Sequence, residues 1–151
     1  MKVSFDFDST LSRKDVQRFA KELVTAGHEV WIVTSRISNE QSRLEYTSNY
    51  TLDRIYKSNK KLFRVADNVG IKRQHIMFCN FTDKIDFIKD KGFAFHLDDD
   101  SDELIAIMQS TDTCKPINVE HSEWEMDCRK ILNTIRKRQN VEVKVISKIF
   151  D

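Results

Sequence analysis

The sequence predicts an α/β fold, a three-layer α/β/α sandwich with a mainly parallel, Rossmann-like central sheet. Short apolar segments typical of strands alternate with amphipathic segments typical of helices along the whole chain. Because a helix separates each strand from the next, we expect crossover connections, parallel strands and helices on both faces of the sheet. The apolar segments are nearly continuous, as expected of strands that are buried on both sides.

Length and composition predict one soluble domain. No Pro-, Gly- or Ser-rich linker divides the chain, so residues 1–151 are expected to form a single domain with its own core. The 25 Lys and Arg residues nearly balance the 24 Asp and Glu residues, so net charge does not indicate binding to nucleic acid or membrane. The sequence has no long apolar run, no signal-peptide pattern and three widely spaced cysteines, which favours a cytoplasmic protein with reduced thiols.

The first part of the chain supplies two strands and the helix between them. The first apolar, strand-like run lies at the N-terminus and ends in Asp6 and Asp8. In the helix that follows, Ser12 and Asp15 have the spacing of a capping box, and apolar residues recur at helical spacing over residues 16–24. Residues 29–33 predict the second strand.

The middle of the chain repeats this order. Residues 38–50 are polar and weakly periodic and form a candidate small covering element, whereas residues 52–69 carry one apolar stripe and predict a long helix. Residues 75–79 predict the third strand, and a short helix is expected to begin near Lys84. Residues 93–97 predict the fourth strand.

The last third predicts a helix over residues 104–108 and a short strand over residues 116–119. Residues 124–135 have the pattern of an amphipathic helix, and valines alternate over residues 141–145 as in a final strand. Residues 120–151 are therefore expected to form a C-terminal extension of one helix and one strand.

Reactive side chains stand where strands end, which is the edge at which open parallel sheets bind their ligands. Alone, the first acidic pair also fits an Asp-rich turn. Several such groups at equivalent positions of one sheet favour a functional site. These groups are Asp6 and Asp8 after the first strand, Thr34 and Ser35 after the second, Lys84 in the helix after the third, and Asp98 and Asp99 after the fourth.

These residue types suit phosphoryl transfer. An aspartate can attack phosphorus to form an aspartyl-phosphate, and a second aspartate can protonate the leaving oxygen and then activate water. A magnesium ion held by carboxylates would offset the charge of the phosphate. A lysine adds a compact positive charge, and a threonine hydroxyl can donate to a phosphate oxygen.

Four segments resemble the motifs of the haloacid dehalogenase-like (HAD) superfamily, in the order of that family. Residues 5–11 contain an Asp-x-Asp-x-Thr sequence like its first motif, and residues 30–34 resemble the second. Lys84 resembles the third motif, and residues 95–99 resemble the double-aspartate form of the fourth. The resemblance covers about residues 1–110 and implies a magnesium-dependent phosphatase.

The resemblance also implies a role for each motif residue. Ser35 and Arg36 stand beside the second motif and are candidate substrate contacts. The implied roles are Asp6 as nucleophile and metal ligand, Asp8 as general acid/base and as a metal ligand through its main-chain carbonyl, Thr34 as phosphoryl-binding residue, Lys84 as counter-charge, and Asp98 and Asp99 as the remaining metal ligands.

Some assignments stay open within the resemblance. Ser9 stands where glycine is common in the first motif. Lys89 and Lys91 compete with Lys84 for the third motif, although Lys84 is favoured by its place at a helix start. Asp100 extends the acidic run, so the metal-ligand assignment could shift by one residue.

The spacing of the motifs leaves no room for a separate cap domain. A capless or minimal-cap phosphatase implies an open site for a large phosphorylated substrate, or a site that an oligomeric partner closes. Nucleotides, nucleic-acid ends, small metabolites and phosphoproteins all remain candidate substrates. Tyr46 or Tyr50 is a candidate for stacking on a base, with a core or surface role as the alternative.

Two other function classes compete with hydrolysis. Receiver-type signalling domains also combine acidic groups, a Thr or Ser and a Lys, but their phosphorylated Asp ends the third strand, where this chain has Cys79 and Asn80. The second alternative is a HAD-like fold that binds its ligand without hydrolysing it. His96 lies within the fourth strand and is expected to face a flanking helix.

Overall fold

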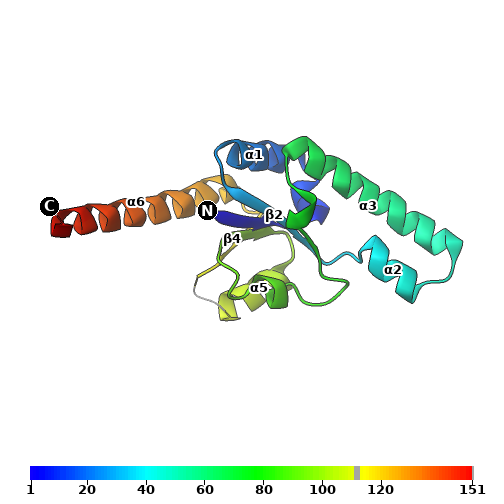
Figure 1. Ribbon diagram of the computed structural model, residues 1–151. Coiled ribbons are helices and arrows are strands. Elements are labelled where there is room, and N and C mark those ends of the chain that lie inside the picture. Colours follow the sequence, from blue (N-terminus) through cyan, green and yellow to red (C-terminus); the bar gives the residue numbers. More distant parts are fainter. Residues whose placement is uncertain (111–112, 151) are drawn as a thin grey trace.

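The computed structural model describes residues 1–110 and 113–150 of the chain. Five parallel strands form one sheet in the order β3-β2-β1-β4-β5 (Figure 1). The predicted Rossmann-like α/β class is therefore confirmed, and the described sheet is wholly parallel. The strands are β1 (Lys2–Phe5), β2 (Glu29–Thr34), β3 (Ile76–Phe78), β4 (Phe93–Asp98) and β5 (Lys115–Asn118).

Helices cover both faces of the sheet and complete the three layers (Figure 1). One apolar core joins the sheet to α1, α3 and the first half of α6, and a second core joins the opposite face to α4 and α5. The helices are α1 (Lys14–Thr25), α2 (Asn39–Glu45), α3 (Asn49–Val69), α4 (Ile85–Ile88), α5 (Ser101–Ser110) and α6 (Trp124–Phe150), with single turns η1 (Phe7–Leu11) and η2 (Arg73–His75).

The C-terminal end of α3 and the N-terminal end of α1 are capped in different ways. Gly70 ends α3 with a left-handed backbone, φ 96°, which glycine adopts without a steric penalty. The capping box predicted at Ser12 is wrong, because Arg13 holds the N-cap position of α1 without a side-chain cap. The Asp15 carboxylate binds the Arg13 guanidinium at 2.7 Å instead of reaching back to Ser12.

The register of the sheet brings the ends of β1 and β4 level with each other. Phe5 pairs with Leu97, and the backbone N–H of Asp6 donates to the Leu97 carbonyl at 2.9 Å. Asp6 and Asp98 therefore leave adjacent strands at the same edge. This edge carries the candidate site.

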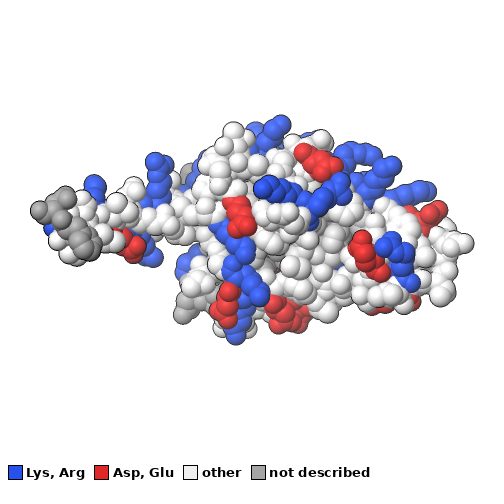
Figure 2. All heavy atoms as spheres, viewed as in Figure 1, with Lys and Arg blue, Asp and Glu red and all other residues white. Residues whose placement is uncertain are grey.

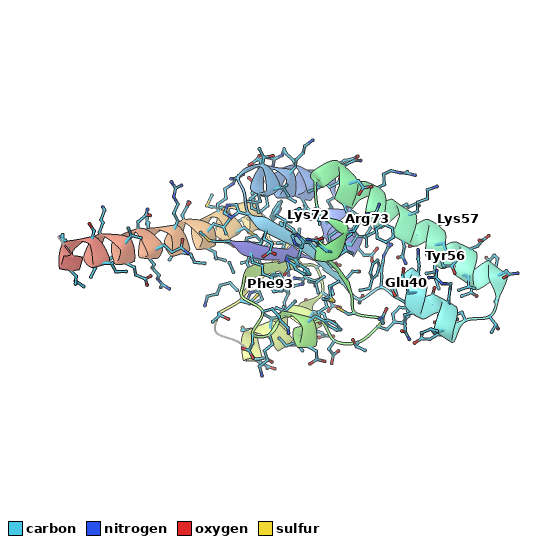
Figure 3. The ribbon with its side chains drawn as sticks, viewed as in Figure 1. Glu40, Tyr56, Lys57, Lys72, Arg73 and Phe93 are labelled. Atoms are coloured by element: carbon cyan, nitrogen blue, oxygen red, sulfur yellow. The ribbon has the colours of Figure 1, made fainter. Side chains whose placement is uncertain are left out.

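The candidate covering element, residues 38–50, forms α2 and the first residues of α3. Its helix begins at Ser38, whose hydroxyl accepts a hydrogen bond from the Gln41 N–H at 3.0 Å. Asn59 of α3 is buried and donates to the Asn39 side chain at 2.8 Å, which fixes the two helices together. Figure 3 locates this helix pair through Glu40 on α2 and Tyr56 on α3.

The strand predicted over residues 141–145 is wrong, because these residues continue α6 as far as Phe150. Val141, Val143 and Val145 are all exposed, and the helix extends beyond the sandwich to the C-terminus (Figure 1). No Gly or Pro interrupts the helix after Trp124, and among the described residues none of the five strands pairs with residues 141–145. In the described part of the chain, no helix has both the length and the apolar character of a membrane span.

Candidate active site

Three charged side chains are buried together at the carboxyl ends of β1 and β4. They are Asp6, Asp98 and, from the residue before α4, Lys84. The Lys84 Nζ donates to Asp6 Oδ1 at 2.8 Å and to Asp98 Oδ2 at 2.6 Å. We call these residues the charge cluster. Lys89 and Lys91, the competing lysines of the sequence, are exposed.

The charge cluster holds two carboxylates but one ammonium group. Burial and the negative charge of Asp98 raise the pKa of Asp6 to about 8, although Lys84 acts in the opposite direction. Burial also opposes the charge on Lys84, but the two carboxylates outweigh it and raise the pKa of Lys84 above its ordinary value. An additional cation would therefore favour the ionised form of Asp6.

His96 extends the charge cluster into the sheet. It is fully buried, and burial lowers its pKa, which favours the neutral ring. The ring nitrogens lie 2.8 Å from the Asp98 carboxylate and 2.8 Å from the Ser4 hydroxyl. A neutral ring satisfies both contacts when Nε2–H donates to Asp98 and Nδ1 accepts from Ser4.

His96 contacts two side chains of the sheet itself, Ser4 and Asp98, and its expected orientation toward a flanking helix remains a prediction. Its position two residues before Asp98 places both side chains on the same side of the strand. Ser4 pairs with His96 in the sheet register, which explains their contact. Burial opposes ionisation of Asp98, but the hydrogen bond from His96 and the charge of Lys84 together lower the pKa of Asp98.

Asp99 brings a third carboxylate to this edge. One oxygen each of Asp6, Asp98 and Asp99 lie within 4.8 Å of one another. The Thr10 hydroxyl lies between two of them, 3.4 Å from Asp6 Oδ2 and 3.5 Å from Asp99 Oδ1. Three carboxylates offer the hard oxygen ligands that Mg²⁺ prefers, so these residues fit the predicted metal.

Asp100 has a different role from its two neighbours. Its backbone N–H donates to Asp98 Oδ1 at 3.0 Å. Its own carboxylate accepts from the N–H groups of Asp102 and Glu103 at the start of α5, at 3.0 and 3.4 Å. The geometry therefore favours Asp98 and Asp99 over Asp100 as metal ligands.

The Asp8 side chain pairs with Arg36 and not with the charge cluster. The turn after Asp6 contains Ser9 with a left-handed backbone, φ 57°, at the position where glycine was expected. The Asp8 side chain is 56% exposed and binds the Arg36 guanidinium through both oxygens, at 2.7 and 2.9 Å. Its contact with a metal through the main-chain carbonyl remains a prediction.

The residues after β2 form the other side of the site. Thr34 is buried, and its hydroxyl accepts from the Arg36 N–H at 3.3 Å. Arg36 also donates to the Ser58 carbonyl of α3 at 2.8 Å and lies over the Phe7 ring at 4.8 Å. Ser35, the second candidate substrate contact, has an exposed side chain.

Comparison with known proteins gives no match. No family model matches the chain, no curated protein is significantly similar to it, and no solved structure matches its fold at a significant level. The HAD-like assignment therefore rests on the four sequence segments and remains a prediction.

The sequence prediction did not include Ser4, Thr10 or Glu103 among the site residues. Thr10 completes the Asp-x-Asp-x-Thr sequence, so its contact with Asp6 could have been anticipated. The Glu103 carboxylate accepts from the Lys84 N–H at 3.1 Å and thereby helps to fix the start of α4. Ser4 carries no sequence signal of its own, since its contact with His96 depends on the register between β1 and β4.

Proposed function

We propose that this protein is a magnesium-dependent phosphomonoester hydrolase that acts through an aspartyl-phosphate intermediate. The observation that carries the proposal is the charge cluster with Asp99 beside it. It combines a buried candidate nucleophile, a fixed ammonium group and three carboxylates suited to one divalent cation. A signalling or binding module without turnover is the alternative.

Asp6 is the nucleophile in the first step. One of its carboxylate oxygens forms a bond to phosphorus while the bond from phosphorus to the ester oxygen breaks, and the leaving oxygen takes a proton from Asp8. In the second step Asp8 removes a proton from water, the water oxygen bonds to phosphorus, and the bond from Asp6 breaks to release phosphate.

Lys84 and Thr34 support the phosphoryl group in this proposal. The Lys84 ammonium holds the Asp6 carboxylate in place and offsets the negative charge of the carboxylate and of the phosphoryl group that it attacks. Thr34 ends the neighbouring strand β2, and its hydroxyl is the candidate donor to a phosphoryl oxygen. Ser35 is the more accessible candidate for the rest of the substrate.

Arg36 positions Asp8 as general acid and base. Its two donors hold both oxygens of the Asp8 carboxylate, and its contact with the Ser58 carbonyl fixes it to α3. In the first step Asp8 must carry a proton, so at least one of the two contacts with Arg36 opens when substrate binds.

Asp6, Asp98 and Asp99 are the proposed Mg²⁺ ligands, with the Asp8 carbonyl as the fourth protein group. Bound Mg²⁺ would neutralise charge on the phosphate and keep Asp6 ionised. A cytoplasmic location forms part of the proposal, and the three buried, free cysteines suit a reducing compartment.

Phosphate release from a panel of phosphomonoesters tests the proposal, with the wild-type protein and Asp6→Asn compared with and without Mg²⁺. We expect release by the wild-type protein with Mg²⁺ and none by Asp6→Asn. Release that persists in Asp6→Asn, or that needs no divalent cation, would contradict the mechanism. A stable phosphorylated Asp6 with no release from any ester would favour the signalling alternative.

A further inference from the structure

A pocket of about 420 Å³ opens beside Arg36, on the side of the site formed by α3 and the loop that follows β3. Half of its ten lining residues are aromatic or arginine. We call it the aromatic pocket and define it by Arg36, Tyr46, Tyr50, Arg54 and Phe81. Arg36 connects it to the candidate site, since the same guanidinium binds Asp8.

The aromatic pocket exposes rings that the fold leaves unburied. Tyr50 is 71% exposed and Phe81 is 66% exposed, whereas Tyr46 is half-buried. One exposed aromatic residue is ordinary on a protein surface. Three rings around one pocket, two from residues 46–50 and one from the loop at Phe81, instead favour a flat, apolar ligand group that can stack against them.

The backbone that carries Phe81 is strained. Asn80 and Phe81 both have left-handed conformations, φ 52° and φ 65°. Asparagine adopts this region readily, but a bulky aromatic residue seldom does. Strain of this kind persists only where the surrounding structure enforces it, and it is concentrated at functional sites.

Hydrogen bonds to the loop after β2 enforce the strained conformation. The Phe81 N–H donates to the Ser35 carbonyl at 2.8 Å, and the Asn80 N–H donates to the Arg36 carbonyl at 3.1 Å. The Asn80 side chain accepts from the Ser38 N–H at 2.9 Å. The loop after β2 therefore fixes the position of Phe81 at the pocket, close to Arg36, which binds Asp8.

The charge around the aromatic pocket favours an anion. Its lining includes two arginines and no acidic residue. Arg36 is paired with Asp8, whereas Arg54, whose guanidinium lies 5.7 Å from the centre of the Tyr50 ring, is the arginine left to attract an anion. Figure 2 shows Lys and Arg side chains gathered over α3. The exposed charged residues of this helix are basic Arg54, Lys57, Lys60, Lys61 and Arg64 and acidic Asp53 and Asp67.

We infer that the aromatic pocket binds the base of a nucleoside phosphate and so directs its phosphate to the charge cluster. Stacking on Phe81 and Tyr50 holds the base, while Arg54 attracts the anion. This inference rests on the proposed function where it says that the phosphate is hydrolysed at the charge cluster. The binding of the base does not depend on hydrolysis. The nucleoside phosphate is either a free mononucleotide or the phosphorylated end of a single-stranded nucleic acid.

The test measures binding of adenosine 5′-monophosphate to the full-length Asp6→Asn protein with Mg²⁺, so that no turnover interferes. In this background Phe81→Asn removes the ring and places a residue suited to the left-handed backbone. We expect the affinity to fall about 5- to 150-fold, as the loss of one stacking contact predicts. Tyr50→Leu is a second variant that does not alter the strained loop, and it should weaken binding in the same direction.

Met108→Ala is the matched control, because it removes an exposed apolar side chain from α5 on the opposite face of the sheet. It should leave the affinity unchanged. Ribose 5-phosphate, which has the same phosphate and sugar but no base, should bind more weakly than the nucleotide by a similar factor. Equal affinity for the two ligands, or unchanged affinity in both Phe81→Asn and Tyr50→Leu, would overturn the inference.

One further ligand distinguishes a free nucleotide from the phosphorylated end of a nucleic acid. A second ligand tests the main competing assignment, a phosphopeptide. Tighter binding of a 5′-phosphorylated oligodeoxyadenylate than of the mononucleotide identifies a nucleic-acid end, whereas equal binding identifies a free nucleotide. Tighter binding of a phosphotyrosine peptide than of either would contradict the assignment of a base to the pocket.

The readouts also distinguish this inference from the proposed function. If nucleotide binds through Phe81 but no phosphomonoester is hydrolysed, the pocket assignment holds and the phosphatase assignment fails. If p-nitrophenyl phosphate is hydrolysed but nucleotide binds no better than ribose 5-phosphate, the phosphatase assignment holds and the pocket assignment fails.

Discussion

The charge cluster and the aromatic pocket adjoin each other but are built in opposite ways. Asp6 and Asp98 leave adjacent strands, are buried, and have charged partners within 3 Å. The aromatic pocket comes from a helix pair and a strained loop, and two of its rings are mostly exposed. The sheet therefore positions the proposed catalytic groups, whereas segments outside the sheet form the proposed ligand pocket.

Because the two regions are built differently, we expect mutations in them to affect different properties of the protein. Changes in the charge cluster should reduce both stability and activity, because they leave buried charges without partners. Changes in the aromatic pocket should alter ligand affinity with little loss of stability, because their side chains contribute little to the core.

Lys84→Met is expected to have the largest effect. It leaves Asp6 and Asp98 buried without their counter-charge, and we expect a loss of about 3–5 kcal/mol in the free energy of unfolding together with loss of turnover. Urea unfolding and phosphate release measure the two effects. Lys89→Met is the control, because Lys89 is exposed and should change stability by no more than about 0.5 kcal/mol. Equal stability of the two variants would contradict the assignment of a buried ion-paired cluster.

Asp8→Asn tests the boundary between the two regions. Turnover should fall by about 10²- to 10⁴-fold, because the variant has no group to move the proton. Stability should change by only about 0–1 kcal/mol, since the ion pair with Arg36 is exposed at Asp8. Steady-state kinetics and thermal unfolding measure these effects, and wild-type turnover in Asp8→Asn would exclude Asp8 as the acid and base.

Magnesium should stabilise the charge cluster directly. At a concentration of 100 times its Kd, Mg²⁺ should add about 2.7 kcal/mol to the free energy of unfolding, which corresponds to a rise of roughly 5–10 °C in Tm. Asp99→Asn should reduce this shift, whereas Asp100→Asn should keep it, because the Asp100 carboxylate binds backbone groups of α5. The opposite pattern in the two variants would assign the metal to Asp100.

Phe81→Asn should have only a small effect on stability, and this effect should raise the free energy of unfolding rather than lower it. Asparagine relieves the left-handed strain at this position, so the free energy of unfolding should rise by up to about 1 kcal/mol. Thermal unfolding of the protein without nucleotide measures the change. A clear loss of stability would show that the Phe81 ring supports the fold and would weaken the contrast between the two regions.

Much of this architecture could be predicted because it depends on local patterns. Apolar runs identified the five strands of the sheet, and the end of each strand identified the edge at which Asp6, Asp98 and Lys84 meet. The crossover rule then placed these residues together without knowledge of side-chain positions.

The remaining features depend on contacts that a local pattern does not contain. The valines of residues 141–145 alternate as in a strand, but in the described structure they pair with no strand and continue α6. His96 lies in a strand buried on both faces, so hydrophobic alternation does not reveal which way its ring points. The pairing of Asp8 with Arg36 and the left-handed loop at Phe81 likewise depend on the meeting of separate loops.

The position of β1 at the centre of the sheet has a consequence for the order of folding. Its pairing with β2 needs only the chain as far as Thr34, whereas its other edge stays open until β4 has been synthesised. An unpaired strand edge is prone to aggregation, so the nascent chain carries this hazard through α3 and β3. Asp6 meets Asp98 at the step that closes this edge, so the two carboxylates of the charge cluster come together when β4 joins the sheet, before β5 is added.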